Sequence, residues 1–192
     1  MTGTFITLEG IDGSGKSTVL EMLYEHYGCS LTSEPSTNYT GRYVRDALQE
    51  DTPPFMDFFL FMADRHYHIE NDIKPILEEG EMIISDRFTH STLAYQPVQL
   101  SEWLDDPKWF MQQVMEPWNI RPHLTIFLDI SVETSLERCG QDEKYENREM
   151  LEKVYSNYKE LLLNDHRMIR VDAEKPLNDV FDDCVTLIEE IR

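Results

Sequence analysis

The residues with the clearest chemical meaning form one glycine-rich stretch near the start of the chain. It reads Gly10-Ile11-Asp12-Gly13-Ser14-Gly15-Lys16-Ser17 and matches the pattern GxxxxGK[ST] in full. Glycines let successive backbone N–H groups curl around phosphate oxygens, and the start of a following helix adds partial positive charge. In this pattern the Lys16 ammonium reaches the β- and γ-phosphates of a nucleotide, and the Ser17 hydroxyl holds Mg²⁺. We therefore predict that ATP is bound by Gly10, Ile11, Asp12, Gly13, Ser14, Gly15, Lys16, Ser17 and Thr18.

Such a loop needs a strand before it and a helix after it, and the sequence predicts both. Residues 4–8 form a short β-rich run that stops at Glu9-Gly10. Apolar residues then recur at helical spacing over 19–27. The loop is therefore expected at the carboxyl end of a strand.

Further along, the chain alternates short apolar strands with longer helical patterns. The expected strands are 82–85, 124–130 and 168–171, with 30–33 as a candidate for one more. A helix is expected over 55–79, bent at Pro75 and closed by Gly80, and another over 177–191. Strands without polar alternation, interleaved with helices, are typical of a parallel sheet covered on both faces. We predict an α/β fold in which a five-stranded parallel sheet is flanked by helices and ligands bind beyond the carboxyl ends of its strands.

Length and charge narrow the class of protein. The chain has 192 residues, with 17 Lys+Arg against 37 Asp+Glu, and a formal net charge of −20. This length fits one domain spanning 1–192, and the excess of acid argues against a nucleic-acid binder. No apolar run is long enough for a membrane span, and three scattered cysteines suit a reducing cytoplasm. The acidity itself has two interpretations, a well-solvated surface or adaptation to a high-salt interior.

The glycine-rich loop alone does not choose among GTPases, ATPases and kinases. A GTPase would need DxxG after a strand and an NKxD base reader, whereas Asp86 is followed by Arg87-Phe88-Thr89 and no NKxD occurs. The accessory domains of motor ATPases do not fit this length. A kinase of a small acceptor is the remaining class.

Several further segments, in order along the chain, identify a family resemblance. The segments are Leu8-Glu9-Gly10-Ile11-Asp12-Gly13-Ser14-Gly15-Lys16-Ser17-Thr18, Ser33-Glu34-Pro35 with Gly41 and Arg45, Phe61-Met62-Ala63-Asp64-Arg65, Ser85-Asp86-Arg87-Phe88-Thr89-His90-Ser91-Thr92-Leu93-Ala94-Tyr95-Gln96, Lys144-Tyr145-Glu146-Asn147, and Val171-Asp172-Ala173. Together they resemble the thymidylate kinase family of P-loop nucleoside monophosphate kinases over nearly the whole chain. The resemblance implies transfer of the γ-phosphate of Mg·ATP to dTMP, a homodimer, and a short lid over about 137–149.

The resemblance also implies how the acceptor's base is recognised. Phe61 would stack on the thymine ring and Arg65 would donate a hydrogen bond to its O4. These two residues are one helical turn apart, so both can face one pocket. The alternatives are a core aromatic for Phe61 and a helix-surface salt bridge for Arg65. Thr92 and Gln96 would meet the base from a neighbouring loop.

Other acceptor roles follow from the same resemblance. Arg87 would grip the acceptor phosphate, a bidentate task suited to a guanidinium. Tyr95 would lie against the sugar and disfavour a ribose 2′-OH, with a packing tyrosine as the alternative. Glu34 and Arg45 would line the acceptor side, and Asp12 would contact the 3′-OH or the metal.

The metal and lid residues complete the expected site. Asp86 resembles a Walker-B carboxylate that reaches Mg²⁺ through water, with a helix or turn cap as its alternative. Tyr145 would approach the acceptor and Glu146 the metal when the lid closes. Arg138 is the arginine expected on the ATP phosphates, since some family members carry an arginine where this chain has Gly13. The family's arginine before Glu-Pro is replaced here by Ser33.

Two alternative functions and two packing questions stay open at this point. A deoxynucleoside kinase would use Glu34 as a base for a 5′-OH, and a nucleotide-binding protein with little turnover would bind ATP without transferring phosphate. His66 and His68 form an HxH pair that lacks a third ligand, so we expect polar helix positions. Three tryptophans are expected to build core: Trp103, Trp109 and Trp118.

Overall fold

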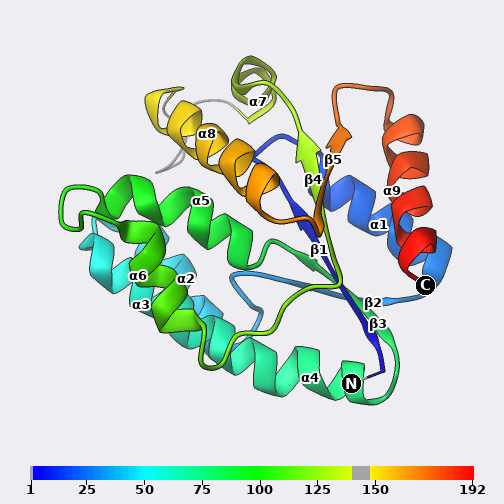
Figure 1. Cartoon of the computed structure of the whole chain (residues 1–192), viewed down its shortest axis with the longest axis horizontal. Helices are drawn as coiled ribbons and strands as arrows, with labels where there is room; N and C mark the ends of the chain where they lie inside the picture. Colours follow the sequence, from blue (N-terminus) through cyan, green and yellow to red (C-terminus); the bar gives the residue numbers. More distant parts are fainter. Residues whose placement is uncertain (1, 140–147) are drawn as a thin grey trace.

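The computed structural model describes residues 2–139 and 148–192, and within these ranges five strands form one parallel sheet (Figure 1). The strand order is β2-β3-β1-β4-β5. The strands are β1 (Thr4–Glu9), β2 (Ser30–Ser33), β3 (Met82–Asp86), β4 (Leu124–Asp129) and β5 (Met168–Asp172). All four pairings are parallel, which confirms the predicted α/β architecture.

Helices cover both faces of the sheet and explain its apolar strands. Figure 1 shows α1 (Lys16–Tyr27) and α9 (Leu177–Ile191) on one face, with α5 (Thr89–Leu100) and α8 (Arg148–Asn164) on the other. All six residues of β4 are buried, as are five of the six in β1. Strands covered on both sides lose the polar alternation of half-exposed strands, as the sequence indicated.

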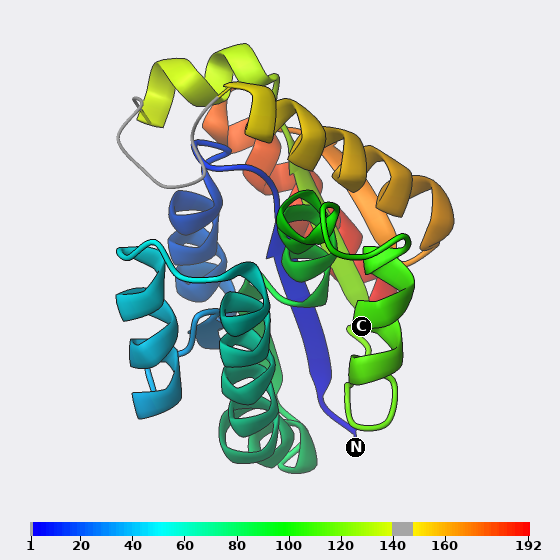
Figure 2. The same cartoon turned by 90° about the vertical axis from the view of Figure 1, so that its left-hand side faces the viewer.

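The remaining helices form two groups. One group carries residues expected to bind the acceptor and is called the acceptor-side helices: α2 (Tyr39–Leu48), α3 (Pro54–His68), the π-helical turn η1 (Ile69–Ile73), α4 (Lys74–Glu78) and α6 (Pro107–Met115). The remaining helix, α7 (Val132–Cys139), lies beyond the amino end of α1 (Figure 2).

The helix expected over 55–79 is interrupted rather than merely bent. Its first part, α3, widens into the π-helical turn η1 and resumes as α4. Pro75 has no N–H to donate to the carbonyl of Asn71, and its ring crowds that carbonyl. A π turn accommodates such a defect. Gly80 ends the segment as expected, with a left-handed φ of 83°.

The expectation that all three tryptophans build core is wrong for two of them. The side chains of Trp103 and Trp109 are 65% and 58% exposed, whereas Trp118 packs against two hydrophobic clusters. Asp106 caps α6 by accepting a hydrogen bond from the Trp109 N–H at 2.9 Å. The resulting helix phase turns Met111 and Met115 inward and leaves Trp109 on the opposite side.

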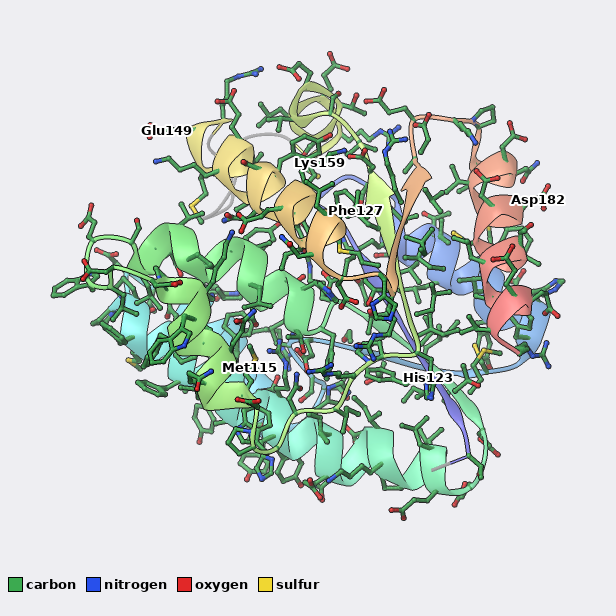
Figure 3. The ribbon with its side chains drawn as sticks, viewed as in Figure 1. Met115, His123, Phe127, Glu149, Lys159 and Asp182 are labelled. Atoms are coloured by element: carbon green, nitrogen blue, oxygen red, sulfur yellow. The ribbon has the colours of Figure 1, made fainter. Side chains whose placement is uncertain are left out.

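The acidic excess lies on the outside of the molecule. Figure 3 shows Asp182 and Glu149 on the outer sides of α9 and α8, and both are exposed. Phe127, by contrast, is buried and stacks on the Tyr158 ring, with 5.1 Å between the ring centroids. Among the helices of residues 2–139 and 148–192, none is long and apolar enough to cross a bilayer.

Candidate functional site

The glycine-rich loop joins β1 to α1, and the side chain of its Lys16 folds back to contact the loop backbone. Gly13 and Gly15 have φ angles of 77° and 86°, a region that favours glycine. Lys16 is 7% exposed, and its ammonium donates to the carbonyls of Gly10 and Ile11 at 3.1 and 3.2 Å. Burial, reinforced by the charge of Arg87, lowers the pKa of Lys16 to about 8. An anion in the loop would replace these weak carbonyl contacts with a charged partner.

The carboxylate of Asp86, at the end of β3, has an oxygen that could bind a cation. Asp86 pairs in register with Leu8 of β1, and its Oδ1 is buried without a hydrogen-bond partner among the described residues. An unpaired buried carboxylate oxygen is costly. Ser17 stands exposed in the first turn of α1. Ser17 and Asp86 therefore fit Mg²⁺, which usually takes one or two protein ligands together with substrate phosphates.

No metal site built from side chains alone competes with this one in the described part of the chain. Residues 2–139 and 148–192 contain no group of three or more His, Cys, Asp and Glu placed to hold a metal. His66 is exposed and lies edge-on to Trp118. His68 is fully buried and contacts Thr32 and Glu34. The expected polar helix position therefore fits His66 and is wrong for His68.

Helix α7 packs directly on the glycine-rich loop. The Ser135 hydroxyl donates to the Asp12 carbonyl at 2.7 Å, and Arg138 Nη1 donates to the Gly13 carbonyl at 2.9 Å. A Cβ on Gly13 would lie 3.0 Å from Cys139 Sγ and 3.2 Å from Arg138 Cβ. A side chain at position 13 would therefore press against α7. Arg138, which is exposed, lies on the α7 side of the loop.

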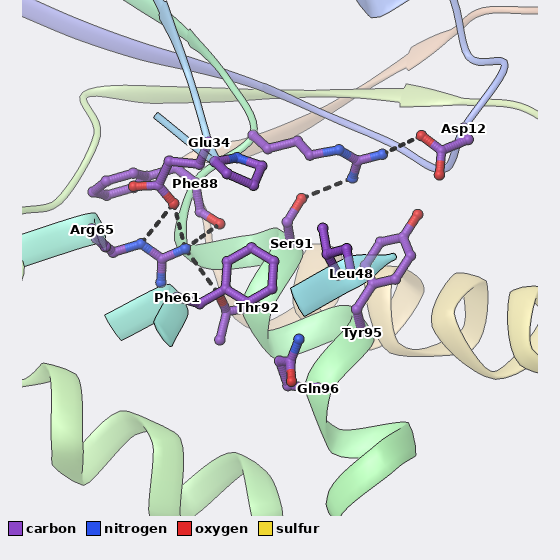
Figure 4. A pocket seen from close by; sticks show the side chains of 12 residues that line it. Asp12, Glu34, Leu48, Phe61, Arg65, Phe88, Ser91, Thr92, Tyr95 and Gln96 are labelled. Carbon is purple, nitrogen blue, oxygen red and sulfur yellow. Dashed lines mark hydrogen bonds and ion pairs between the residues drawn. The ribbon is translucent and has the colours of Figure 1, made fainter. Parts of the chain in front are cut away.

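Arg87 occupies a strained backbone position directly after β3. Its φ of 68° is positive, which is uncommon for a residue with a side chain. Its Nη2 lies 2.6 Å from Asp12 Oδ1, its Nη1 donates to Ser91 Oγ at 3.0 Å, and its guanidinium lies 5.2 Å from the Tyr95 ring centroid (Figure 4). Burial alone would raise the pKa of Asp12, but the charges of Arg87 and Lys16 outweigh it and hold this pKa below its usual value.

A buried carboxylate that the motif analysis did not single out holds this segment in place. Glu9 is fully buried and accepts from the backbone N–H groups of Phe88 and Ser91 at 2.8 and 3.2 Å. Its other oxygen accepts from the Ser91 and Tyr158 hydroxyls at 2.6 and 2.9 Å. It thereby caps the start of α5. A charged residue inside an apolar strand must be paired, and that signal could have identified it.

One cavity of about 180 Å³ joins these groups to the acceptor-side helices. It is lined by Asp12, Glu34, Pro35, Leu48, Phe61, Arg65, Arg87, Phe88, Ser91, Thr92, Tyr95 and Gln96 (Figure 4). The predicted acceptor residues therefore meet in one place, with two exceptions. Leu48, Pro35, Phe88 and Ser91 are additional lining residues, brought in by α2 and by the segments that follow β2 and β3.

Arg65 and Glu34 form a buried ion pair in the wall of this cavity. Arg65 is 1% exposed, and its Nε and Nη2 lie 2.8 and 2.5 Å from Glu34 Oε2. The alternative of a helix-surface salt bridge for Arg65 is therefore wrong. Burial would raise the pKa of Glu34, but Arg65 and His68 outweigh it and hold this pKa below its usual value.

The cavity also contains an aromatic ring that a base could stack on, and a hydrogen-bond acceptor without a partner among the described residues. Phe61 is half-buried and combines both sequence interpretations, because it lines the cavity and also packs on the cluster formed by α3, α5 and α6. Gln96 is 2% exposed, and within the described residues its Oε1 has no hydrogen-bond partner. Buried acceptors are normally satisfied, so this oxygen suits an N–H donor of a bound molecule.

The two exceptions are Arg45 and Tyr145. Arg45 is exposed and directs Nη1 to the carbonyls of Ser36 and Pro35 at 2.5 and 3.3 Å, so it holds the segment after β2 and does not line the cavity. Tyr145 and the predicted metal ligand Glu146 lie outside the described residues, together with Lys144 and most of the expected lid.

Comparison with known proteins shows the family to which this chain is similar. The family model described as thymidylate kinase matches residues 8–184. The chain is 37% identical to a probable thymidylate kinase of Methanococcoides burtonii, across 100% of this chain and 98% of that protein. It is 42% identical to one of Methanoculleus marisnigri over 91% and 89% of the two chains. It is 35% identical to one of Natronomonas pharaonis over 97% of both.

Proposed function

The chain belongs to the thymidylate kinase family, and from this premise we propose that it transfers the γ-phosphate of ATP to dTMP, giving dTDP and ADP. The observation that carries the proposal is the continuous cavity that links Asp12 of the glycine-rich loop to the buried Arg65. One end of this cavity offers charged groups for phosphates, and the other offers an aromatic face and polar groups for a base. A pyrimidine monophosphate needs this combination.

The base end of the cavity would recognise thymine by shape and by hydrogen bonds. Phe61 supplies a face for stacking, and Arg65 supplies donors for the O4 carbonyl. Gln96 Oε1, buried and unpartnered within the described chain, would accept the N3–H of the ring. Tyr95 would lie against the sugar, and Thr92, which accepts from Arg65 at 2.8 Å, would fix the arginine beside the base.

At the phosphate end, two cations would exchange their present partners for substrate oxygens. Arg87 would leave Asp12 for the acceptor phosphate, and Lys16 would leave the loop carbonyls for the β- and γ-phosphates of ATP. Ser17 and Asp86 would hold Mg²⁺, which when bound would neutralise charge on the transferring phosphate. The acceptor phosphate is already an anionic nucleophile, so positioning and charge stabilisation suffice without a side-chain base.

The donor side would be completed by α7 and the segment that follows it. Arg138 lies against the glycine-rich loop and would reach the ATP phosphates from outside. We place a short lid over about 137–149 within one domain spanning 1–192, with Tyr145 and Glu146 approaching the substrates. Closing such a lid excludes water from the phosphoryl transfer.

The deoxynucleoside kinase alternative is not favoured by the geometry of Glu34. A base for a 5′-OH needs a free carboxylate oxygen, whereas Oε2 of Glu34 accepts from Arg65 and Oε1 faces His68. The cavity also presents Arg87, a partner for a phosphate that a nucleoside lacks. A nucleotide-binding protein with little turnover is the second alternative, and it would bind ATP without consuming it.

We further propose a homodimer in the cytoplasm. Neighbouring helices α2 and α3 expose aromatic side chains, with Tyr39, Tyr43 and Phe59 each more than half exposed. Exposed aromatic side chains are enriched at protein contacts. All three cysteines are free thiols, which suits a reducing compartment. Sedimentation of the wild type against Phe59→Glu would test the dimer.

The proposed reaction is tested by coupled ADP release with Mg·ATP. The acceptors are dTMP, dUMP, dGMP, dCMP and thymidine, each at low and at molar salt. Highest activity with dTMP is expected. Activity with thymidine but not dTMP would move the chain to the nucleoside kinases, and tight ATP binding without turnover would favour the binding protein. The salt profile also separates the two interpretations of the acidic surface.

A further inference from the structure

His68 ends α3 and is fully buried three residues after Arg65. Its Nε2 lies 2.6 Å from the Thr32 hydroxyl of β2, and its Nδ1 lies 3.3 Å from Glu34 Oε1. An ionised carboxylate can only accept, so Nδ1 carries the proton that faces Glu34. In the neutral ring, Nε2 then accepts from Thr32. The imidazole therefore has a fixed tautomer and joins β2 to Glu34.

Glu34 divides its two oxygens between His68 and Arg65. Oε1 faces the imidazole, while Oε2 accepts from both Nε and Nη2 of the arginine. The guanidinium is planar, so holding Nε and Nη2 also sets the direction of Nη1. Among the described residues, Nη1 contacts only the weak acceptor Met115 Sδ, at 3.2 Å. It retains a donor for a ligand.

We propose that His68 is a positioning residue that orients Arg65 through Glu34 and thereby sets discrimination at position 4 of the pyrimidine. This inference rests on the proposed dTMP kinase function. A 4-oxo group accepts from a guanidinium, whereas a 4-amino group presents N–H donors that oppose it. Without the Nδ1 proton, Oε1 of Glu34 would lose its buried partner. The carboxylate would turn to share both oxygens with Arg65, and the arginine fork would tilt away from the ring.

A pair of amide variants separates this role from simple packing. His68→Asn keeps an N–H near the position of Nδ1, while His68→Gln places its amide near Nε2 and keeps only the Thr32 contact. His66→Asn, exposed two residues earlier on the same helix, is the matched control. Each variant is assayed with dTMP and with 5-methyl-dCMP, which carries a 4-amino group. The readouts are kcat and KM for each acceptor, KM for ATP, and Tm.

We expect His68→Gln to raise KM for dTMP and to lower the dTMP preference in kcat/KM about tenfold or more, with KM for ATP unchanged. His68→Asn should retain most of the preference, and His66→Asn all of it. Equal preferences in the two His68 variants, or a loss confined to kcat and Tm, would overturn the inference. A wild type that does not phosphorylate dTMP would instead contradict the proposed function, and this inference would fall with it.

Discussion

Arg87 and Asp12 form an ion pair at the phosphate-loop end of the cavity, with Nη2 of the arginine 2.6 Å from Oδ1 of the aspartate. The pair joins the segment after β3 to the loop after β1, the two segments that would meet the phosphates in the proposed reaction. The acceptor phosphate would compete with Asp12 for the same guanidinium. In the proposed reaction the pair would keep the partly buried guanidinium of Arg87 neutralised until a substrate anion replaces the carboxylate.

Arg87→Ala should remove the partner of the acceptor phosphate. We expect kcat/KM for dTMP to fall about 10³-fold, because a charge interaction in a water-excluded site is lost. Arg42→Ala is the control, since the Arg42 side chain is 79% exposed and pairs with Asp46 on the same helix. Steady-state kinetics with dTMP varied at saturating ATP makes the comparison. Activity of Arg87→Ala close to that of the control would contradict the assigned acceptor site.

Lys16→Met should change the pH dependence of stability. Burial, with the charge of Arg87, lowers the pKa of Lys16 from 10.5 to about 8 in the folded chain. Between these pH values the unfolded state binds more protons, so the free energy of unfolding rises with pH across that window. The Tm of Lys16→Met minus that of wild type should be most positive at pH 7 and decrease by about pH 10.

The control for Lys16 is Lys153→Met. Lys153 is more than half exposed and pairs with Glu149 on the same helix, so its substitution should give no such trend. Melting curves without ligand over this pH range make the measurement, and a Tm difference for Lys16→Met that does not vary with pH would contradict the lowered pKa. Loss of ATP binding by Lys16→Met, followed by calorimetry, is expected in addition.

Glu9→Gln should destabilise the fold more than Tyr158→Phe. The carboxylate accepts from two backbone N–H groups and two hydroxyls, and an amide replaces one acceptor with a donor. We expect a loss of about 2–3 kcal/mol in the free energy of unfolding for Glu9→Gln and about 1 kcal/mol for Tyr158→Phe. Urea unfolding measures both. The double variant should lose less than the sum, because the residues share one network, and simple additivity would argue against that network.

Local sequence patterns predicted the strands and helices, because each of these elements depends mainly on residues that are close in the sequence. The strand Met82–Asp86, which ends beside Arg87, follows from an apolar run and its break. Glu9 and His68 were not assigned roles, since their partners lie far away in sequence. Glu9 contacts Tyr158, and His68 contacts Thr32. These contacts form only when the helices pack on the assembled sheet.

For the same reason, the sequence could not decide whether Arg65 faces a pocket or forms a salt bridge on the helix surface. Helical spacing placed it on one face with Phe61 but could not show that β2 would bring Glu34 against it. Its burial depends on this pairing, since an unpaired guanidinium would not be buried. For Arg45 the sequence predicted a place on the acceptor side. The structure instead directs its guanidinium, from α2, to a backbone carbonyl.

Gly13→Ala should cost more than Gly28→Ala, although both glycines have a left-handed φ. Gly13 has φ 77° and Gly28 has φ 61°, but a Cβ would lie 3.0 Å from Cys139 Sγ at Gly13 and meet nothing within 4 Å at Gly28. Gly28→Ala therefore reports the backbone strain alone, about 1 kcal/mol. Gly13→Ala adds a clash that pushes α7 from the glycine-rich loop, so we expect a larger loss of stability together with weaker ATP binding. Urea unfolding and calorimetric titration with ATP test both effects. Equal losses in the two variants would mean that α7 gives way without cost, and unchanged ATP affinity in Gly13→Ala would mean that the packing of α7 does not shape the loop.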